Sequence, residues 1–334
     1  MSDATWPDLE SLTVSVARQL RRRRRARMAG RLLAALAVLL LSAALLTAAW
    51  PYLNRSVNDQ RLEHEAVRAA DKALAFPYNT RDTMIENAVA YNRTLAASGQ
   101  PTLGVAKDPF SGGTSGDWDG DDDPQYGRLL DTDGIGTMAR IRIPKISVDL
   151  RVGHGSGQTT LENGAGHLHG TSLPVGGHGT HTVITAHTDY VNGSMFDRLT
   201  ELKKGDPFYL QVLGRTLAYK VTSIRVTDPI EQSAGDFDAL KVHGQEDEAT
   251  LITCTGPGLT QRLWVTGVRN RMPDQVPYLD QAPGDQRTPI HVGLTVGTGL
   301  LAAGVTLLRV RFRPRKGGAD TIPRHERDHR PRHR

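Results

Sequence analysis

The sequence predicts a mainly β domain, a closed barrel or a sandwich, that follows a helical segment and lies between two membrane-spanning helices. Three observations predict this. Short runs rich in β-branched and aromatic residues recur from Ile141 onward, with Gly and Pro between them. Two uncharged runs, residues 32–50 and 290–308, are each long enough to cross a bilayer as a helix. Amphipathic patterns fill the interval after the first run.

Both apolar runs have basic flanks. Arg residues cluster at 21–25 before the first run and at 309–315 after the second. Because Lys and Arg collect on the cytoplasmic side, both tails are expected inside the cell and the middle outside. The first run could instead be the core of a signal peptide, and the second a buried strand and turn. The expected divisions are a basic tail (1–31), a transmembrane helix (32–50), a second transmembrane helix (289–308) and a basic tail (309–334).

The net charge of +5 comes from these tails. Residues 1–50 and 289–334 hold 18 of the 41 Lys and Arg residues and 6 of the 36 Asp and Glu residues. The part between them keeps 23 basic and 30 acidic residues, a net charge of −7. A nucleic-acid partner is therefore not expected, and the Arg clusters are better suited to holding topology and contacting anionic membrane lipid.

Residues 51–136 are expected to form a helical segment and a loop. Two amphipathic helices are predicted at 57–75 and 80–97, the second ending at Gly99. The loop that follows is rich in Gly and Asp, with carboxylates at 117, 119 and 121–123. Their spacing does not match an EF-hand, so a solvated acidic loop is favoured, and calcium binding stays an open alternative.

The β domain is expected at residues 137–275, with a linker at 276–288 before the second apolar run. A hairpin turn is predicted at residues 213–216, between two alternating runs. The predicted strands are 141–152, 180–186, 208–212, 217–226, 250–254 and 263–268.

Three polar residues stand at the edges of predicted strands. Cys254, the only cysteine in the chain, ends one strand; His187 follows another, and Arg262 opens the next. A thiolate nucleophile needs a neighbour that favours ionisation, and acyl transfer needs a proton donor and a group that stabilises an oxyanion. The three residues supply these functions. Taken singly, each could also be an inert thiol, a surface His or an ordinary strand-edge Arg.

Together they resemble the signature of the sortases, cysteine transpeptidases of Gram-positive cell surfaces. That signature is Thr-Leu-x-Thr-Cys, with a downstream Arg and an upstream His, and here residues 250–254 read Thr-Leu-Ile-Thr-Cys. The resemblance covers about residues 141–270, including Ile-Pro-Lys-Ile at 143–146 and Gly-His-Leu-His-Gly-Thr at 166–171. It implies a closed, mostly antiparallel barrel of about eight strands with His187, Cys254 and Arg262 as catalytic residues.

Within the family the chain looks most like the class C, pilus-assembling type. Members of that class commonly carry two membrane spans and a lid with an Asp-Pro-aromatic motif, which matches residues 108–110 here. The resemblance implies that Asp108 pairs with Arg262 and that Phe110 covers Cys254; a simple turn is the alternative. The residues after the His and the Cys depart from the class pattern, as in Thr-Asp-Tyr at 188–190.

The implied activity is cleavage of an LPXTG-like sorting signal between Thr and Gly, followed by transfer of the acyl group to a pilin Lys. The implied partners are LPXTG-bearing surface proteins or pilin subunits, with a cell-wall precursor as a further acceptor, and the chemistry needs no cofactor. A zinc site built from His167, His169, His178 and His181 lacks the expected ligand spacing. Two alternatives remain: a housekeeping sortase that anchors proteins to peptidoglycan, and a non-catalytic, membrane-tethered β-barrel that binds other proteins.

Overall fold

The structure is a computed structural model that describes residues 9–101, 103, 123–190, 193–228, 237–273, 293–294, 297–299, 301–302 and 304–305. It contains two compact units. The first comprises residues 1–49 together with 291–334, and the second comprises residues 50–290.

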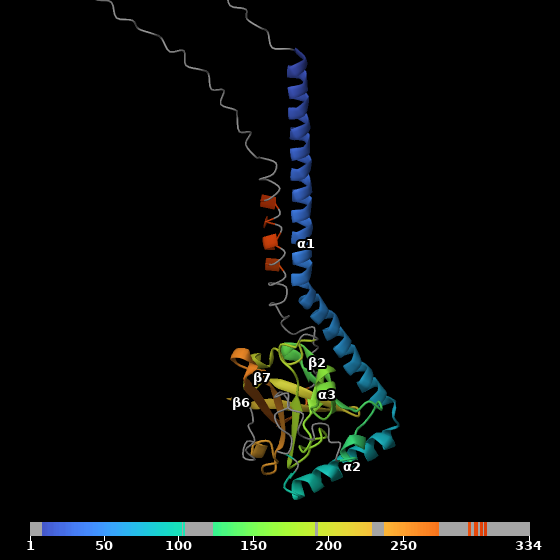
Figure 1. The fold of residues 1–334 in the computed structure, drawn as a ribbon. Coiled ribbons are helices and arrows are strands. Elements are labelled where there is room, and N and C mark those ends of the chain that lie inside the picture. The colour runs from blue at the N-terminus through green and yellow to red at the C-terminus, as the bar shows by residue number, and fades with distance from the viewer. Residues whose placement is uncertain are drawn as a thin grey trace, which may run out of the picture. The chain divides into compact units, whose positions relative to one another are not determined.

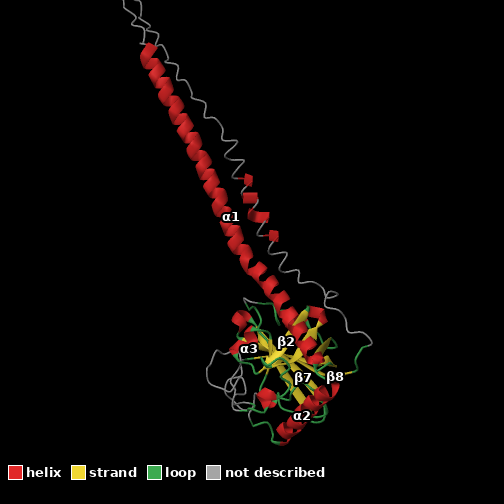
Figure 2. Cartoon of the chain, turned by 90° about the vertical axis from the view of Figure 1, so that its right-hand side faces the viewer, coloured by secondary structure: helices red, strands yellow, loops and turns green. Residues whose placement is uncertain are grey.

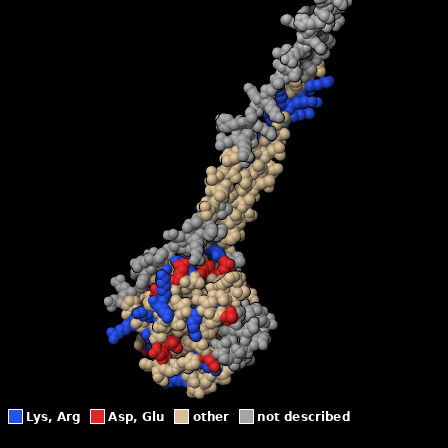
Figure 3. Space-filling view, turned by 90° about the vertical axis from the view of Figure 1, so that its left-hand side faces the viewer, with Lys and Arg blue, Asp and Glu red and all other residues tan. Residues whose placement is uncertain are grey.

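Helix α1 runs from Leu9 to Ala75 without interruption. The part of the chain that the structure describes contains one helix long and apolar enough to cross a membrane, the portion of α1 within Val16–Ala75. Figure 3 shows basic side chains followed by an uncharged stretch along α1. The separate helix predicted at 57–75 is therefore wrong in its start, because the helix continues through Pro51. Most of the second predicted span lies outside the described residues.

Eight strands form a closed barrel in the order β1-β2-β3-β4-β7-β8-β6-β5 (Figures 1 and 2). Two neighbouring pairs, β2–β3 and β4–β7, are parallel, and the others are antiparallel. The mostly antiparallel barrel expected from the sequence is thus confirmed. The strands are β1 (Thr137–Ile143), β2 (Val148–His154), β3 (Ala165–His167), β4 (Thr180–Thr185), β5 (Pro207–Val212), β6 (Arg215–Thr227), β7 (Asp247–Thr255) and β8 (Gln261–Asn270).

The strand predicted at 141–152 is two strands, β1 and β2, joined by the 3-10 turn η2 (Pro144–Ile146). Pro144 has no N–H to donate to a ladder, and Ser147 follows in a left-handed conformation (φ 56°), so the chain reverses here. Strand β3 was not predicted because its three residues, Ala-Gly-His, carry no β signal.

The hairpin predicted at 213–216 is confirmed as the β5–β6 connection. Val212 pairs with Arg215, so the loop consists of two residues, Leu213 (φ 47°) and Gly214 (φ 83°). Two positive φ angles give the turn that best matches the twist of the flanking strands.

The strands β4, β7 and β8 have apolar residues on both faces. Their inner face contributes Ile184, Leu251 and Val265 to the main core. Their other face contributes to a smaller group, called here the outer apolar cluster, which consists of Leu103, Leu168, Val183, Phe237, Leu240, Ile252 and Trp264. Because side chains alternate along a strand, the two sets lie on opposite sides of the same sheet.

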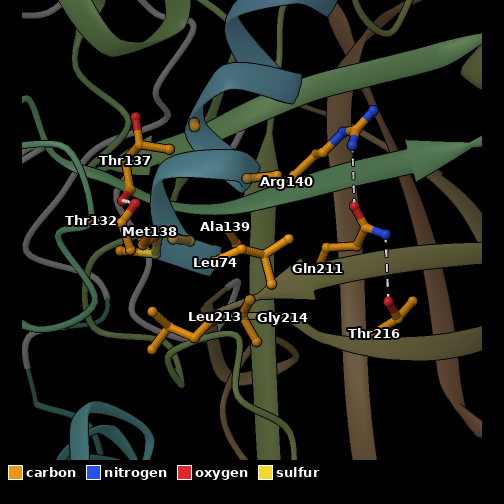
Figure 4. Close-up of a pocket in the computed structure, with 14 residues that line it drawn as sticks. Leu74, Thr132, Thr137, Met138, Ala139, Arg140, Gln211, Leu213, Gly214 and Thr216 are labelled. Carbon is orange, nitrogen blue, oxygen red and sulfur yellow. Dashed lines mark hydrogen bonds between the residues drawn. The ribbon is translucent and has the colours of Figure 1, made fainter. Parts of the chain in front are cut away.

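Helix α2 (Tyr78–Ala97) and the C-terminal part of α1 pack on the barrel within the second unit. Helix α2 buries Ile85, Ala88, Asn92 and Leu95. The Asn92 amide donates to the Leu173 carbonyl at 3.0 Å and accepts from the Leu173 N–H at 2.7 Å, which satisfies both buried groups. The end of α1 lines a mostly apolar pocket over β1 and β5 that includes Leu74, Met138 and Leu213, with Arg140 and Gln211 hydrogen-bonded at its edge (Figure 4).

The other short elements are helix α3 (Gln158–Glu162) and the 3-10 turns η1 (Tyr126–Arg128), η3 (Leu199–Glu201) and η4 (Pro257–Leu259). Asp123 begins η1: its carboxylate accepts the N–H groups of Gln125 and Tyr126 and the Tyr91 hydroxyl. The rest of the acidic loop, at 117–122, lies outside the described residues.

Candidate active site

The strand register places Cys254, His187 and Arg262 at one rim of the barrel. Strands β7 and β8 are antiparallel, and Cys254 is the direct partner of Arg262 across them. Strand β4 is parallel to β7, and the Ala186 N–H donates to the Ile252 carbonyl at 3.2 Å, so His187 extends from the same end of the sheet as Cys254. The sequence predicted this grouping, and the strand pairing brings the three residues to one edge.

The candidate site opens on the outer face of the sheet. Cys254 lies two residues from Ile252 and Arg262 two residues from Trp264, and both Ile252 and Trp264 belong to the outer apolar cluster. Residues two apart on a strand face the same way. The thiol and the guanidinium are therefore next to the buried outer apolar cluster and outside the barrel interior.

Cys254, the only cysteine of the chain, is a half-buried thiol outside any disulfide. The preceding residue, Thr253, is buried and donates its hydroxyl to the Ala186 carbonyl at 2.7 Å. This bond joins the residue before the cysteine to the residue before the histidine. It therefore fixes the ends of β7 and β4 relative to each other, which helps to hold the two reactive side chains in place.

His187 is half-buried, and its ring stacks on the Tyr190 ring with centroids 4.8 Å apart and planes 15° apart. Burial lowers the pKa of His187 below its usual value, and the charge of Glu162 partly opposes this. At neutral pH the imidazole is therefore mostly uncharged. Tyr190 was noted in the sequence as a departure from a family pattern, but its contact with His187 could not be read there because the two residues meet through a turn.

Arg262 is only 4% exposed. Its Nη1 donates to the carbonyl oxygens of Leu259 and Gln261, each at 3.1 Å. Leu259 belongs to the tight connection between β7 and β8, in which Gly256 and Gly258 have positive φ, and Gln261 begins β8. A buried cation is costly unless it is hydrogen-bonded, so these two bonds help to keep the guanidinium in place beside the thiol.

The predicted lid residues, Asp108 and Phe110, lie outside the described residues. Of the four histidines considered for zinc, His167 and His181 are buried in hydrogen bonds to other groups. Within the described ranges no group of three His, Cys, Asp or Glu residues is arranged to hold a metal ion.

A thiol, an imidazole and a guanidinium at one rim of a closed eight-stranded barrel define a cysteine acyltransferase type of site. The sortase domain model matches residues 141–270 of the chain. Among curated proteins, Sortase A of Streptococcus agalactiae is 30% identical over 128 residues, 37% of this chain and 49% of that protein. Sortase A of Bacillus anthracis is 32% identical over 117 residues, 35% of this chain and 51% of that protein. The chain thus spans about half the length of the curated relatives it matches.

Solved structures match over a longer stretch. Sortase C1 of GBS Pilus Island 1 is 32% identical with a TM-score of 0.55, covering 65% of this chain and 96% of that one. Sortase C-1 from Streptococcus pneumoniae is 34% identical with a TM-score of 0.53, covering 64% of this chain and 99% of that one. This chain belongs to the sortase family, whose members are cysteine transpeptidases. Its structural neighbours are class C pilus sortases.

Proposed function

We propose that this chain is a membrane-anchored transpeptidase that cleaves an LPXTG-like sorting signal between Thr and Gly and joins the new acyl group to a Lys amine of a pilin subunit. The observation that carries the proposal is the pairing of Cys254 with Arg262 beside the end of β4, where His187 lies. The pilus-related titles of the structural neighbours support the choice of acceptor.

In the first step the Cys254 thiolate attacks the Thr carbonyl carbon, and Arg262 stabilises the oxyanion that forms. The C–N bond to Gly then breaks. His187, as imidazolium, gives its proton to the departing Gly nitrogen, which leaves a thioester on Cys254 and a neutral imidazole. Because burial lowers the pKa of His187, the imidazolium needed for this step is a minor species at neutral pH.

In the second step a Lys amine attacks the thioester carbon. Neutral His187 accepts a proton from the attacking nitrogen, the C–S bond breaks, and the thiolate returns as an isopeptide bond forms. The two steps regenerate the starting Cys254 thiolate and His187 imidazolium. They use protein side chains only.

The outer apolar cluster is buried, so it supports the rim from below and does not itself form the peptide surface. Ile252 and Trp264 flank the thiol and guanidinium on the same face, and both are at most 4% exposed. An extended peptide whose scissile carbonyl reaches Cys254 would lie along the rim above this cluster. We assign this cluster to the support of the rim, and the rim to chemistry.

The lid and the second membrane span complete the proposal. Asp108 would pair with Arg262 and Phe110 would cover Cys254, so both residues would slow access to the thiol. If replacing both with Ala leaves the rate of thiol labelling at Cys254 unchanged, the lid is wrong. Both termini would be cytoplasmic, with the catalytic barrel outside the cell, which labelling of single added cysteines in each tail from one side of the membrane would test.

The proposed activity can be tested with the full chain in detergent, an LPXTG-type peptide and two acceptors, a pilin-derived Lys peptide and a cell-wall-type peptide amine. We expect a branched product with the Lys peptide, and none with Cys254→Ala. Joining only to the cell-wall amine would indicate the housekeeping alternative. Absence of any product or acyl adduct with either acceptor, in the presence of a folded barrel, would favour the non-catalytic binding module.

A further inference from the structure

The loop that follows His187 returns to the barrel edge through Asp197. Its described residues are 188–190 and 193–198. The Phe196 N–H donates to the His187 carbonyl at 3.0 Å, and the Asp197 N–H donates to the Ser194 carbonyl at 2.7 Å. The loop therefore begins and ends beside His187, and its conformation decides where Tyr190 lies against the histidine ring.

The Asp197 carboxylate organises the first part of this loop. Its Oδ1 accepts the Asp189 N–H at 2.5 Å and the Thr188 hydroxyl at 3.3 Å. Asp189 has a positive φ of 53°, a conformation that needs local hydrogen bonds to be populated by a residue other than Gly. The carboxylate thus fixes the backbone between His187 and the Tyr190 ring that stacks on it.

Helix α1 holds this loop from outside. Arg55 contacts two carboxylates, Asp189 Oδ1 at 2.8 Å and Asp197 Oδ2 at 3.5 Å. One turn along the helix, the Asp59 carboxylate accepts both the N–H of Ser194 at 2.7 Å and its hydroxyl at 2.8 Å.

The helix also approaches the loop backbone closely. A Cβ at Gly193 would lie 2.9 Å from Leu62 Cδ1, so the small residue permits this approach. Three successive turns of α1 therefore contact the loop.

We propose that Arg55 is a positioning residue for His187, acting through Asp197 and the loop that presents Tyr190. The effect expected on kcat when Arg55 is replaced rests on the proposed transpeptidase function. Arg55 follows the apolar portion of α1 by a few residues, so the helix proposed to anchor the chain also contacts the loop that follows His187.

The charge balance at Asp197 explains why a cation is needed there. Burial raises the pKa of Asp197 to about 6, although Arg55 and the Asp189 N–H favour the ionised form; the charge of Asp189 adds to the rise. Arg55 from α1 and Asp189 from the loop are the charged groups that act on it. Without Arg55, two carboxylates would remain together, and the protonated Asp197 would be a weaker acceptor for the loop.

The test uses the full chain in detergent and the peptide assay described above, with Arg55→Gln, Arg55→Lys, Asp197→Asn and the double variant Arg55→Gln/Asp197→Asn. We expect Arg55→Gln to lower kcat by about tenfold to a hundredfold with KM within about twofold, because the ring is misplaced and the peptide surface is intact. Arg55→Lys should recover most of kcat. Because Arg55 acts through Asp197, the fold-loss of kcat in the double variant should be smaller than the product of the fold-losses in the two single variants.

The matched control is Arg215→Gln. Arg215 also carries an ion pair between helix and barrel, with Asp82 at 2.7 Å, but it lies on the β5–β6 side and away from the loop. Its kcat should equal that of the wild type. If Arg55→Gln also retains the wild-type kcat, or if Arg55→Lys is as impaired as Arg55→Gln, the proposal is wrong.

A second readout does not depend on turnover. The imidazole of His187 can be titrated by NMR after labelling of the histidine rings, with His187→Gln to assign the signal. We expect its pKa to rise toward 6.5 in Arg55→Gln, because the ring leaves its stacked and partly buried position, and to stay unchanged in Arg215→Gln. An unchanged His187 pKa would overturn the proposal. If the wild type shows no transpeptidation but this shift occurs, the proposed function fails and the positioning stands.

Discussion

The barrel holds histidines in two contrasting regions, the interior between β3 and β4 and the rim beyond β4. In the interior, His167 is fully buried: its Nε2 donates to the Ser172 carbonyl at 2.9 Å and its Nδ1 lies 3.0 Å from the Tyr126 hydroxyl. At the rim, His187 is half-buried and lies beside Tyr190. Burial lowers the pKa of both, to about 3 for His167.

The difference separates a structural histidine from a reactive one. Both ring nitrogens of His167 form hydrogen bonds with groups of the protein. The same is true of His181, whose ring nitrogens contact the Lys241 carbonyl and the Thr250 hydroxyl. Such rings cannot exchange protons with a substrate without breaking buried hydrogen bonds. His187 lies at a strand end near the only thiol and keeps part of its surface accessible. Position at the rim, more than residue type, identifies the reactive group.

The largest effect expected from this contrast is kinetic. His187→Ala should lower kcat/KM about 10² to 10⁴-fold, because it removes the proposed proton donor. Its free energy of unfolding should change by less than about 1.5 kcal/mol, the value of a lost ring stack. Transpeptidation rates and urea titrations measure the two quantities. A large loss of stability with normal turnover would reverse the assignment of the two regions.

Replacement of the interior histidine should have the opposite effect. His167→Ala leaves the buried Ser172 carbonyl without the Nε2 donor, removes one partner of the Tyr126 hydroxyl and opens a cavity, so we expect a loss of about 2 to 4 kcal/mol. Tyr126→Phe, which removes only the hydroxyl, should cost less. Thermal or urea unfolding measures both. Equal stability of His167→Ala and wild type would contradict the structural role.

Acid should unfold the barrel through its buried histidines. The pKa values of His167 and His181 are lowered to about 3 and 4, so the unfolded chain takes up protons first as pH falls below 6.5. Stability is therefore lost on acidification from pH 6.5, by about 1.4 kcal/mol per pH unit for each ring. Asp197, whose pKa is raised to about 6, opposes this below pH 6.

The lowered pKa values of three histidines, His167, His181 and His187, against the raised pKa of Asp197 leave a net loss of stability on acidification, which urea unfolding at pH 7.0 and 5.5 should show. Tyr126→Phe retains the buried ring of His167 and should keep the same dependence on pH. Stability that is constant or rises between pH 7.0 and 5.5 would contradict the neutral, buried state of the histidine rings.

The smallest effect is expected at a surface ion pair. The side chains of Arg215 and Asp82 are 52% and 33% exposed, so solvent screens their attraction. Arg215→Ala should change the free energy of unfolding by less than about 1 kcal/mol and leave turnover unchanged. A larger change would mean that α2 depends on this pair for its docking.

Most of the barrel was predictable because its strands carry alternating apolar residues and its turns carry Gly or Pro. Cys254 and Arg262 were found as strand-edge residues, and their pairing follows from the short connection between β7 and β8. Strand β3 was missed because three small or polar residues give no periodicity. The division of 141–152 into two strands was missed although Pro144 marked it.

The contacts of Arg55 could not be predicted, since its partners lie more than 130 positions away in the sequence. A helical pattern places Arg55 on a turn of α1, but only the fold shows which loop that turn meets. The same holds for the contact of His187 with Tyr190, which depends on the left-handed conformation at Asp189. Contacts of this kind depend on tertiary geometry, so they could not be predicted from the sequence.

The central claim, that Cys254 is the acyl acceptor at a sortase rim, is tested most directly by trapping the thioester. The full chain would be mixed with an LPXTG-type peptide in the absence of any amine acceptor, quenched in acid and digested for mass spectrometry. The account predicts an adduct of the peptide cleaved after Thr on the fragment that contains Cys254, and none in Cys254→Ala. A thiol that reacts with small alkylating reagents but never carries the cleaved peptide would contradict it.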